Sequence, residues 1–277
     1  MTMMPLAPRT VLSFALCLAA LASADALAAD PCRERVYDLL MQAYPRAQSE
    51  TGDDGELLRT AGANPRWINV GYGVVCKVWP ADPGKTLLAV QLGHEAAESP
   101  DGATYDLEML VADSAQPRIL QRYRQDGALV SDAIRVGALT LDTARYRLNE
   151  NTTAFGLRIE YLGSSRANPY SGVVLNLYAS QDGKLRPVLR GLEVSLSRGE
   201  WDTNCAGEFS TVRRTVAVDA KRDRGYAGLL VNSAQEDSRA APQGRDCSEK
   251  TVAKNKSSVR LAYDGREYVV PKSLRGL

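Results

Sequence analysis

The stretch Trp67-Ile68-Asn69-Val70-Gly71-Tyr72-Gly73-Val74-Val75-Cys76 marks the point at which the sequence changes from helical to extended periodicity. Apolar side chains occupy every second position from Ile68 to Cys76, and alternation with a period of two is typical of a strand that buries one face. Gly71 and Gly73 fall on the opposite face, where they leave room for a close neighbour. The stretch therefore predicts one continuous strand.

The same alternation recurs downstream in many short segments, separated by turn signals such as Asp126-Gly127 and Asp182-Gly183. A parallel sheet would need a helix between successive strands, and no such pattern follows Trp67. We therefore predict a mostly β fold, with antiparallel sheets arranged as a sandwich, a barrel or a small propeller. The predicted strands are Thr86–Leu92, Tyr105–Val111, Arg118–Arg124, Ala133–Thr140, Arg145–Leu148, Ala154–Tyr161, Val173–Ala179, Leu185–Leu189, Leu192–Leu196, Glu208–Val218 and Gly228–Val231.

A hairpin is predicted near the C-terminus, because Asp264-Gly265 is a favoured two-residue turn. Folding the chain about this turn places Leu261 opposite Tyr268 and Val259 opposite Val270, so that apolar residues pair with apolar residues.

Upstream of Trp67, the sequence predicts one amphipathic helix over Pro31–Tyr44, since apolar residues recur at helical spacing and Pro45 ends the pattern. The polar segment Arg46–Asn64 is predicted to be a loop, with a short helix near Glu56–Thr60.

Residues 1–28 have the pattern of a secretory signal peptide, with Arg9, an apolar run from Val11 to Leu21, and a small-residue cleavage site at Ala26-Leu27-Ala28. A membrane anchor is the alternative, but a spanning helix needs roughly 20 apolar residues. We therefore expect a mature chain of residues 29–277, folded as a single β-rich domain with no membrane span. Its expected location is the periplasm or the extracellular space.

The cysteines of the mature chain agree with export. Cys32, Cys76, Cys205 and Cys247 form an even set, which in an oxidising compartment predicts two disulfides. Three pairings are possible, and Cys32 with Cys76 and Cys205 with Cys247 is favoured because each pair lies in its own half of the chain. Each bond would close a loop of about 40 residues and stabilise by roughly 3 to 4 kcal/mol. A zinc site is the alternative, but paired CxxC spacing is absent.

Composition argues against a nucleic-acid partner. The formal net charge is +1, so no global field attracts a polyanion. The basic clusters at Lys221-Arg222 and from Lys250 to Lys256 are interpreted as solvated, loop-like surface.

His94 is the single histidine, which restricts catalysis. A hydrolytic zinc site needs more imidazoles, and the Gly-x-Ser-x-Gly motif of a serine hydrolase is absent. Oxidised cysteines would supply no thiolate, and phosphate-binding glycine motifs are also absent. The sequence therefore predicts no catalytic residue, no metal and no cofactor, and His94 is expected to be an exposed loop residue.

Two kinds of side chain remain as candidates. Paired carboxylates across a cleft would suit a carbohydrate-active hydrolase, and flat aromatic rings could stack on a sugar or anchor a protein. The acids near predicted strand ends are Glu95, Glu98, Asp142, Glu200 and Asp202, and the aromatics are Trp67, Tyr72, Trp79 and Trp201.

The leading hypothesis is a non-enzymatic exported binding protein that presents loops to a protein or glycan ligand of the cell envelope, with Trp67, Trp79 and Trp201 as possible contacts. The alternatives are the hydrolase and a structural component of an envelope assembly.

Overall fold

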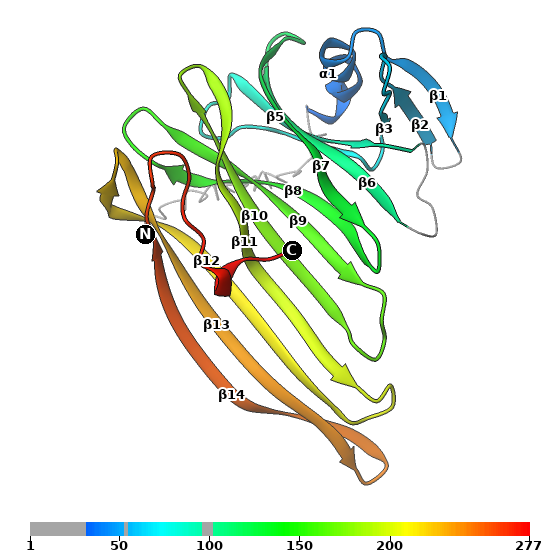
Figure 1. Ribbon diagram of the computed structural model, residues 1–277, viewed down its shortest axis with the longest axis vertical. Coiled ribbons are helices and arrows are strands. Elements are labelled where there is room, and N and C mark those ends of the chain that lie inside the picture. The colour runs from blue at the N-terminus through cyan, green and yellow to red at the C-terminus, as the bar shows by residue number, and fades with distance from the viewer. Residues whose placement is uncertain (1–31, 53–54, 96–101) are drawn as a thin grey trace, which may run out of the picture.

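The computed structural model describes residues 32–52, 55–95 and 102–277, and it shows two antiparallel sheets of seven strands each (Figure 1). This confirms the predicted mostly β fold. The predicted signal peptide lies outside the described residues. No helix within the described ranges is long and apolar enough to cross a membrane.

The N-terminal sheet has the strand order β1-β2-β3-β5-β6-β7, and β4 also pairs with β5. Its strands are β1 (Gln48–Gly52), β2 (Gly55–Arg59), β3 (Trp67–Asn69), β4 (Val74–Val78), β5 (Lys85–Gly93), β6 (Ala103–Asp113) and β7 (Ile119–Ser131). The C-terminal sheet runs in simple sequence order from β8 to β14. Its strands are β8 (Ile134–Arg147), β9 (Thr153–Gly163), β10 (Tyr170–Gln181), β11 (Lys184–Trp201), β12 (Gly207–Asp223), β13 (Tyr226–Gln243) and β14 (Asp246–Leu261).

The two sheets pack face to face over a shared apolar core. Leu87 and Met109 contribute to this core from the N-terminal sheet, and Leu157 and Tyr178 contribute from the C-terminal sheet. Trp79 is also part of it, with its ring edge-on to Phe155 at a centroid separation of 5.5 Å. The architecture is therefore a β sandwich.

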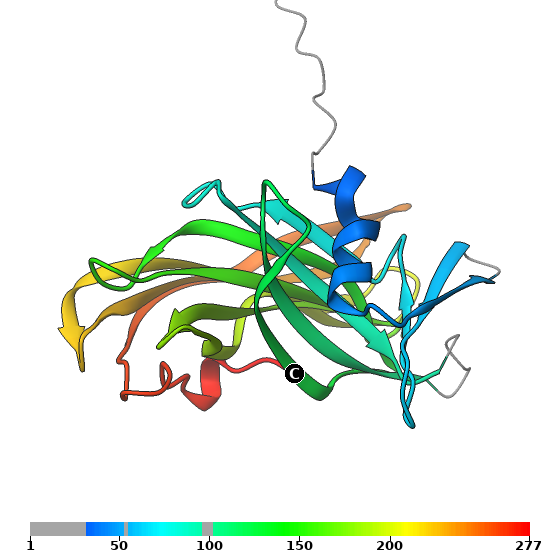
Figure 2. The same cartoon turned by 90° about the horizontal axis from the view of Figure 1, so that it is seen from above.

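Further layers cover the outer faces of both sheets, as Figure 2 shows on opposite sides of the sandwich. The helix α1 (Val36–Ala43) buries Leu39 and Leu40 against Leu88 and Leu110 of the N-terminal sheet. The C-terminal segment, residues 262–277, crosses the other sheet and includes the short helix η2 (Lys272–Leu274). Its buried side chains are Tyr263, Tyr268, Val270 and Leu274.

The predicted N-terminal helix is present but shorter than expected. It begins with a 3-10 turn, η1 (Arg33–Arg35), and α1 ends at Ala43. Pro31 lies outside the described residues.

The single strand predicted over Trp67–Cys76 is wrong, because residues 70–73 form a tight turn between β3 and β4. The Asn69 side-chain oxygen accepts hydrogen bonds from the backbone N–H groups of Gly71 and Tyr72, each at 3.0 Å. A Cβ atom at Gly73 would lie 2.9 Å from the Asn69 carbonyl oxygen. The close approach for which glycine leaves room is thus to the chain's own backbone.

Two other local predictions are also wrong. The segment Arg46–Asn64, predicted to be a loop with a short helix near Glu56–Thr60, instead contains β1 and β2, which pair with each other while β2 also pairs with β3. The C-terminal hairpin is shifted in register: Tyr263 pairs with Tyr268, whereas Leu261 pairs with Leu229 of β13. The backbone N–H of Tyr268 instead donates to Val188 of β11 at 2.7 Å.

The basic clusters predicted to be loops lie in strands. Lys221-Arg222 belongs to β12, and Lys250 to Lys256 belong to β14. Lys221-Arg222 lies beside the turn from β12 to β13. Residues 250–256 lie at the opposite end, where β13 and β14 extend beyond the rest of the molecule (lower end of Figure 1), and side chains there are exposed or half-buried on both faces. Sequence periodicity failed here because neither face has an apolar layer to contact.

Both favoured disulfide pairings are confirmed. Cys32 bonds to Cys76, and Cys205 bonds to Cys247. The first bond ties the start of the helical segment to β4. The second ties the turn between β11 and β12 to the start of β14, at the far end of the projecting strands.

Removing the second disulfide by Cys205→Ser and Cys247→Ser is expected to loosen the far end of β12–β14 while the three cores stay folded. Since no core covers residues 246–258, the opening free energy there should fall by about 3 kcal/mol. Hydrogen exchange measures this change. The matched control, Cys32→Ser with Cys76→Ser, should leave exchange in β14 unchanged, and equal effects of the two pairs would contradict the prediction.

Candidate functional site

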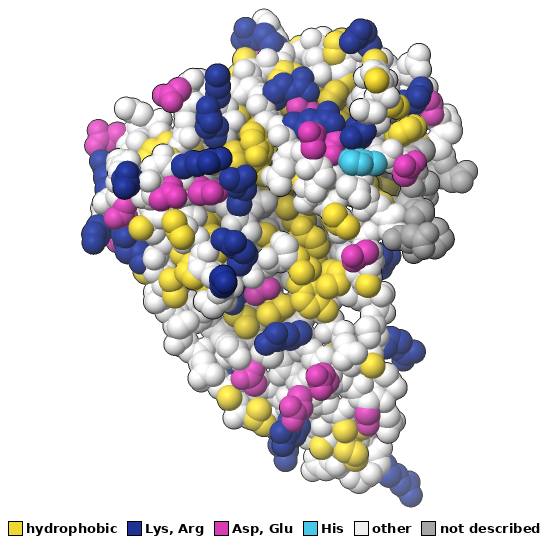
Figure 3. All heavy atoms as spheres, in the orientation of Figure 1, with side chains coloured by type: hydrophobic (Ala, Val, Ile, Leu, Met, Phe, Trp, Pro, Cys, Tyr) yellow, Lys and Arg dark blue, Asp and Glu magenta, His cyan; other side chains and the backbone are white. Residues whose placement is uncertain are grey.

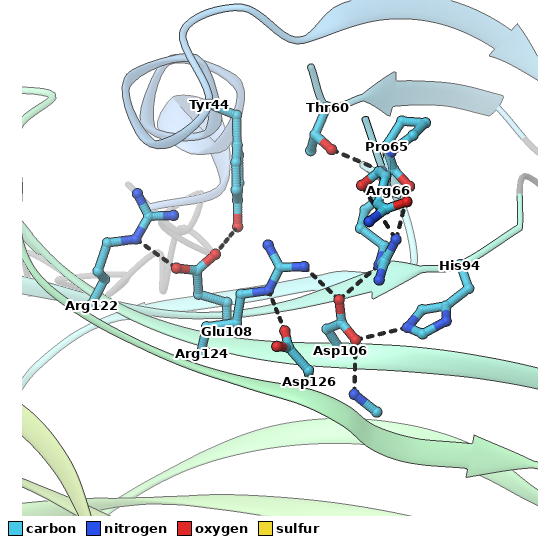
Figure 4. Close-up of polar contacts among 12 residues, drawn as sticks. Tyr44, Thr60, Pro65, Arg66, His94, Asp106, Glu108, Arg122, Arg124 and Asp126 are labelled. Atoms are coloured by element: carbon cyan, nitrogen blue, oxygen red, sulfur yellow. Dashed lines mark hydrogen bonds and ion pairs between the residues drawn. The ribbon is translucent and has the colours of Figure 1, made fainter. Parts of the chain in front are cut away.

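Two carboxylates are buried on the outer face of β6. Asp106 and Glu108 occupy alternate positions in an otherwise apolar strand and are 0% and 1% exposed, respectively. A buried ionised carboxylate is stable only when cations and N–H donors replace its water. Figure 4 shows that both carboxylates are enclosed by such groups.

Asp106 accepts hydrogen bonds from four residues. Arg66 donates through Nε to Oδ2 at 2.7 Å, and Arg124 donates through Nη2 to the same oxygen. His94 Nε2 lies 2.7 Å from Oδ1, which also accepts from the backbone N–H of Gly127 at 2.8 Å. These donors come from the segment before β3, from the end of β5 and from β7. One carboxylate therefore fixes three parts of the N-terminal sheet.

These contacts set the ionisation of Asp106. Burial alone would raise the pKa of Asp106, but the hydrogen bonds from His94, Gly127, Arg66 and Arg124 outweigh that effect and hold the pKa well below its usual range. The carboxylate is therefore ionised throughout the physiological pH range.

Glu108 holds the end of α1 against the sheet. The Tyr44 hydroxyl donates to Oε2 at 2.7 Å, and Arg122 donates through Nε to Oε1 at 2.6 Å. Burial, and then the charge of Glu108, raise the pKa of Tyr44 far above its usual range, so the hydroxyl stays a donor. The Arg122 guanidinium also lies 5.6 Å from the centre of the Tyr44 ring.

His94 lies in the bend directly after β5, as a loop residue would, but its side chain is half-buried because it contacts Asp106. An Asp–His pair can serve a nucleophile. Within the described residues, however, no serine, threonine or cysteine side chain is hydrogen-bonded to His94. No group of three or more potential metal ligands occurs there either. The pair therefore anchors the imidazole to the sheet.

A groove of about 590 Å³ lies where β7, the turn between β10 and β11, and the C-terminal segment meet. We call it the basic groove. Cavities of roughly 300 to 1,000 Å³ are typical of small-molecule sites. The cationic residues among those that line it are Arg122, Lys184, Arg186, Arg190 and Arg266, and Asp182 is its one acidic lining residue. The Arg122 guanidinium itself is turned toward Glu108 and Tyr44, on the side of the sheet that carries α1.

Local backbone geometry brings these side chains together. Asp182 and Gly183 have φ values of 50° and 74° and form the tight two-residue turn that the sequence predicted. Lys184 and Arg186 follow at alternate positions of β11, so they share a face. The Gln121 side chain of β7 donates to the Gly183 carbonyl at 3.0 Å and fixes the turn to the neighbouring sheet.

Three of the five cations have no internal partner. Arg122 and Arg190 pair with carboxylates, whereas Lys184, Arg186 and Arg266 are exposed and form no ion pair with any described residue. Lys and Arg side chains gather on the upper part of the face shown in Figure 3. The lining therefore presents uncompensated positive charge.

The aromatic candidates do not form one platform. Trp79 is only 8% exposed and belongs to the core between the sheets. Trp67 lines a cavity of about 280 Å³ together with Tyr72 and His94. Trp201 ends β11, at the far end of the other sheet.

The acidic candidates are equally dispersed. Asp142 is tied to Arg158 and Tyr146 in the β8–β9 region. Glu95 lies beside His94, Glu200 lies in the projecting part of β11, and Asp202 caps the turn at Cys205. Glu98 lies outside the described residues. The described acids therefore occupy separate surroundings and form no pair across one cleft.

Sequence reasoning missed both the buried carboxylates and the basic groove. A signal for the first was present, because Asp106 and Glu108 interrupt a largely apolar strand at alternate positions, and Arg122 and Arg124 also alternate in β7. The groove had no comparable local signal, since Arg122 and Arg266 are far apart in the chain.

Comparison with known proteins returns no match to a family model, to a curated protein or to a solved structure. The assignment of function therefore rests on the geometry of the chain itself.

Substituting Asp106→Asn is expected to lower the free energy of unfolding by about 3 kcal/mol, because it removes the buried counter-charge that Arg66 and Arg124 share. Urea denaturation measures the loss. The control Asp126→Asn removes another partner of Arg124, but its carboxylate is 82% exposed. It should cost at most about 0.5 kcal/mol. Similar losses of unfolding free energy in the two variants would show that Asp106 stabilises the fold no more than an exposed ion pair does.

The depressed pKa of Asp106 also predicts the acid response. Below about pH 4 the unfolded chain binds a proton that folded Asp106 does not, so stability is complete above that pH and falls as the pH decreases. Urea midpoints between pH 5 and pH 2.5 should fall less steeply in Asp106→Asn than in the wild type. Parallel curves would contradict the prediction.

Proposed function

We propose that this protein is an exported binding protein whose basic groove takes an anionic glycan. The observation that carries the proposal is the set of three cations without internal partners, Lys184, Arg186 and Arg266, around a cavity of about 590 Å³. Two disulfides support export, because such bonds persist in oxidising compartments.

The shape and lining of the groove favour a glycan over a folded protein partner. Stable protein interfaces bury a surface of roughly 1,200 Å² or more, whereas this site is a groove of about 590 Å³. Tyr123 and Pro187 supply apolar surface for the faces of sugar rings, and the cations supply donors for carboxylate or phosphate groups. The ligand class is therefore a short acidic oligosaccharide.

Binding is expected to depend on the ligand's charge. Isothermal titration with an oligogalacturonate should show binding that weakens with added salt, and the methyl ester of the same oligosaccharide, which lacks the charges, should not bind. The triple variant Lys184→Gln, Arg186→Gln and Arg266→Gln should bind at least about tenfold more weakly, because charge-assisted hydrogen bonds are lost.

A matched triple variant on β14 controls for net charge. Lys250→Gln, Lys254→Gln and Lys256→Gln remove the same charge far from the groove and should bind like the wild type. Equal weakening of the two variants would mean that the attraction is non-specific. Binding of pyrophosphate without binding of the oligogalacturonate would exclude a uronic-acid glycan.

A further inference from the structure

Arg190 lies on a β-bulge of β11, where Arg190 and Gly191 together oppose the single residue Asn176 of β10. Gly191 has a φ of 72°, a conformation that favours glycine. Its backbone N–H donates to the Asn176 side-chain oxygen at 2.8 Å. Because a bulge redirects a side chain of its strand, this fixed bulge sets the position of Arg190.

The Arg190 guanidinium lies at the basic groove. It donates through Nε to Glu267 at 3.0 Å, and Glu267 directly follows Arg266, which lines the groove. The hydrogen bond to Glu267, together with the nearby Tyr123 hydroxyl, raises the pKa of Arg190 above its usual value. Tyr123 lines the groove from the N-terminal sheet. The guanidinium therefore lies between the C-terminal segment and β7.

The terminal nitrogens of Arg190 are available to a ligand. A guanidinium carries five N–H donors, and only one of them is on Nε. Arg190 makes no other hydrogen bond to the described residues, and its side chain is 39% exposed.

Glu267 is itself fixed. It lies in the turn that begins at Asp264, whose side chain accepts from the Glu267 backbone N–H at 2.8 Å. The Arg190 guanidinium is therefore oriented before any ligand arrives, which reduces the entropy cost of binding.

We propose that Arg190 is the specificity-determining residue of the basic groove. Its two terminal nitrogens bind one carboxylate of the glycan side-on, and Tyr123, beside the same guanidinium, contacts the sugar ring that bears this carboxylate. The ligand class is consequently a glycan of uronic acids. Lys184, Arg186 and Arg266 supply an attraction that any anion shares. This inference rests on the proposed function.

An arginine-to-lysine substitution separates fork geometry from charge, because lysine keeps the charge but cannot form the bidentate contact. Arg190→Lys should weaken oligogalacturonate binding about tenfold in isothermal titration while leaving its salt dependence unchanged. Arg186→Lys is the matched control within the groove and should bind within about twofold of the wild type, because that side chain acts through its charge.

The orienting carboxylate gives a test in which charge and orientation predict opposite signs. Glu267→Ala makes the groove more positive, so charge alone would tighten oligogalacturonate binding. Loss of the orientation of Arg190 should instead weaken it about threefold. Asp182→Asn is the matched control, because it also removes one negative charge from the lining and Asp182 forms no ion pair with any described residue. Asparagine tolerates the φ of 50° at this position, and the variant should bind at least as tightly as the wild type.

The outcomes separate this inference from the proposed function. Weaker binding by both Arg190→Lys and Glu267→Ala, but by neither control, supports the inference. If Arg190→Lys or Glu267→Ala binds at least as tightly as the wild type, or if Arg186→Lys weakens binding as much as Arg190→Lys, the inference is wrong. The proposed function then still stands if the triple glutamine variant binds weakly. If the wild-type protein does not bind the oligogalacturonate, both fail. Thermal melting identifies any variant that fails to fold, and Glu267→Ala keeps the test valid if Arg190→Lys does so.

Discussion

The buried carboxylates of β6 are the constraint on which the N-terminal half of the molecule depends. Water cannot reach Asp106 or Glu108, so the protein must supply their counter-charges and donors. It does so from separate places: Arg66 from the segment before β3, Tyr44 from the residue after α1, and Arg122 from β7. Apolar contacts alone would let α1 slide on the sheet, whereas these directional bonds fix its position. The hydrogen bonds of these carboxylates thus select one position of α1 on the sheet, which burial of apolar side chains alone would not do.

The basic groove depends on the same arrangement, because its lining is drawn from three layers of the fold. Tyr123 belongs to the N-terminal sheet, Arg190 to the C-terminal sheet, and Arg266 to the C-terminal segment. These side chains come together only when both sheets are packed and the segment is docked. By contrast, the far ends of β12–β14 contact no third layer and are joined there by the disulfide between Cys205 and Cys247. The proposed site therefore lies where three layers of the fold meet, away from the projecting strands.

Sequence periodicity predicted most strands whose faces contact a core, and cysteine positions predicted both disulfides. Sequence periodicity failed where the feature that determines the local structure does not recur at regular spacing. The turn at residues 70–73 depends on one Asn69 side chain and one close backbone approach at Gly73. The projecting part of β14 is polar on both faces, so it has no alternation to detect. Asp106 and Glu108 gave a visible pattern, but their partners could not be named without tertiary contacts. The cations of the groove lie in segments whose neighbourhood exists only in the folded chain.

A near-neutral chain can still carry a selective anion site, because net charge and local charge govern different stages of binding. With a formal net charge of +1, the molecule has little long-range attraction for polyanions. Ionic screening further limits the field of the groove to about 8–10 Å. Selection must then occur at contact, where the orientation of each donor matters more than the number of charges. Glu267 reduces the positive charge of the groove, yet it orients the Arg190 guanidinium. For the proposed function, a guanidinium held in this way gives up part of its attraction for all anions and gains discrimination among them.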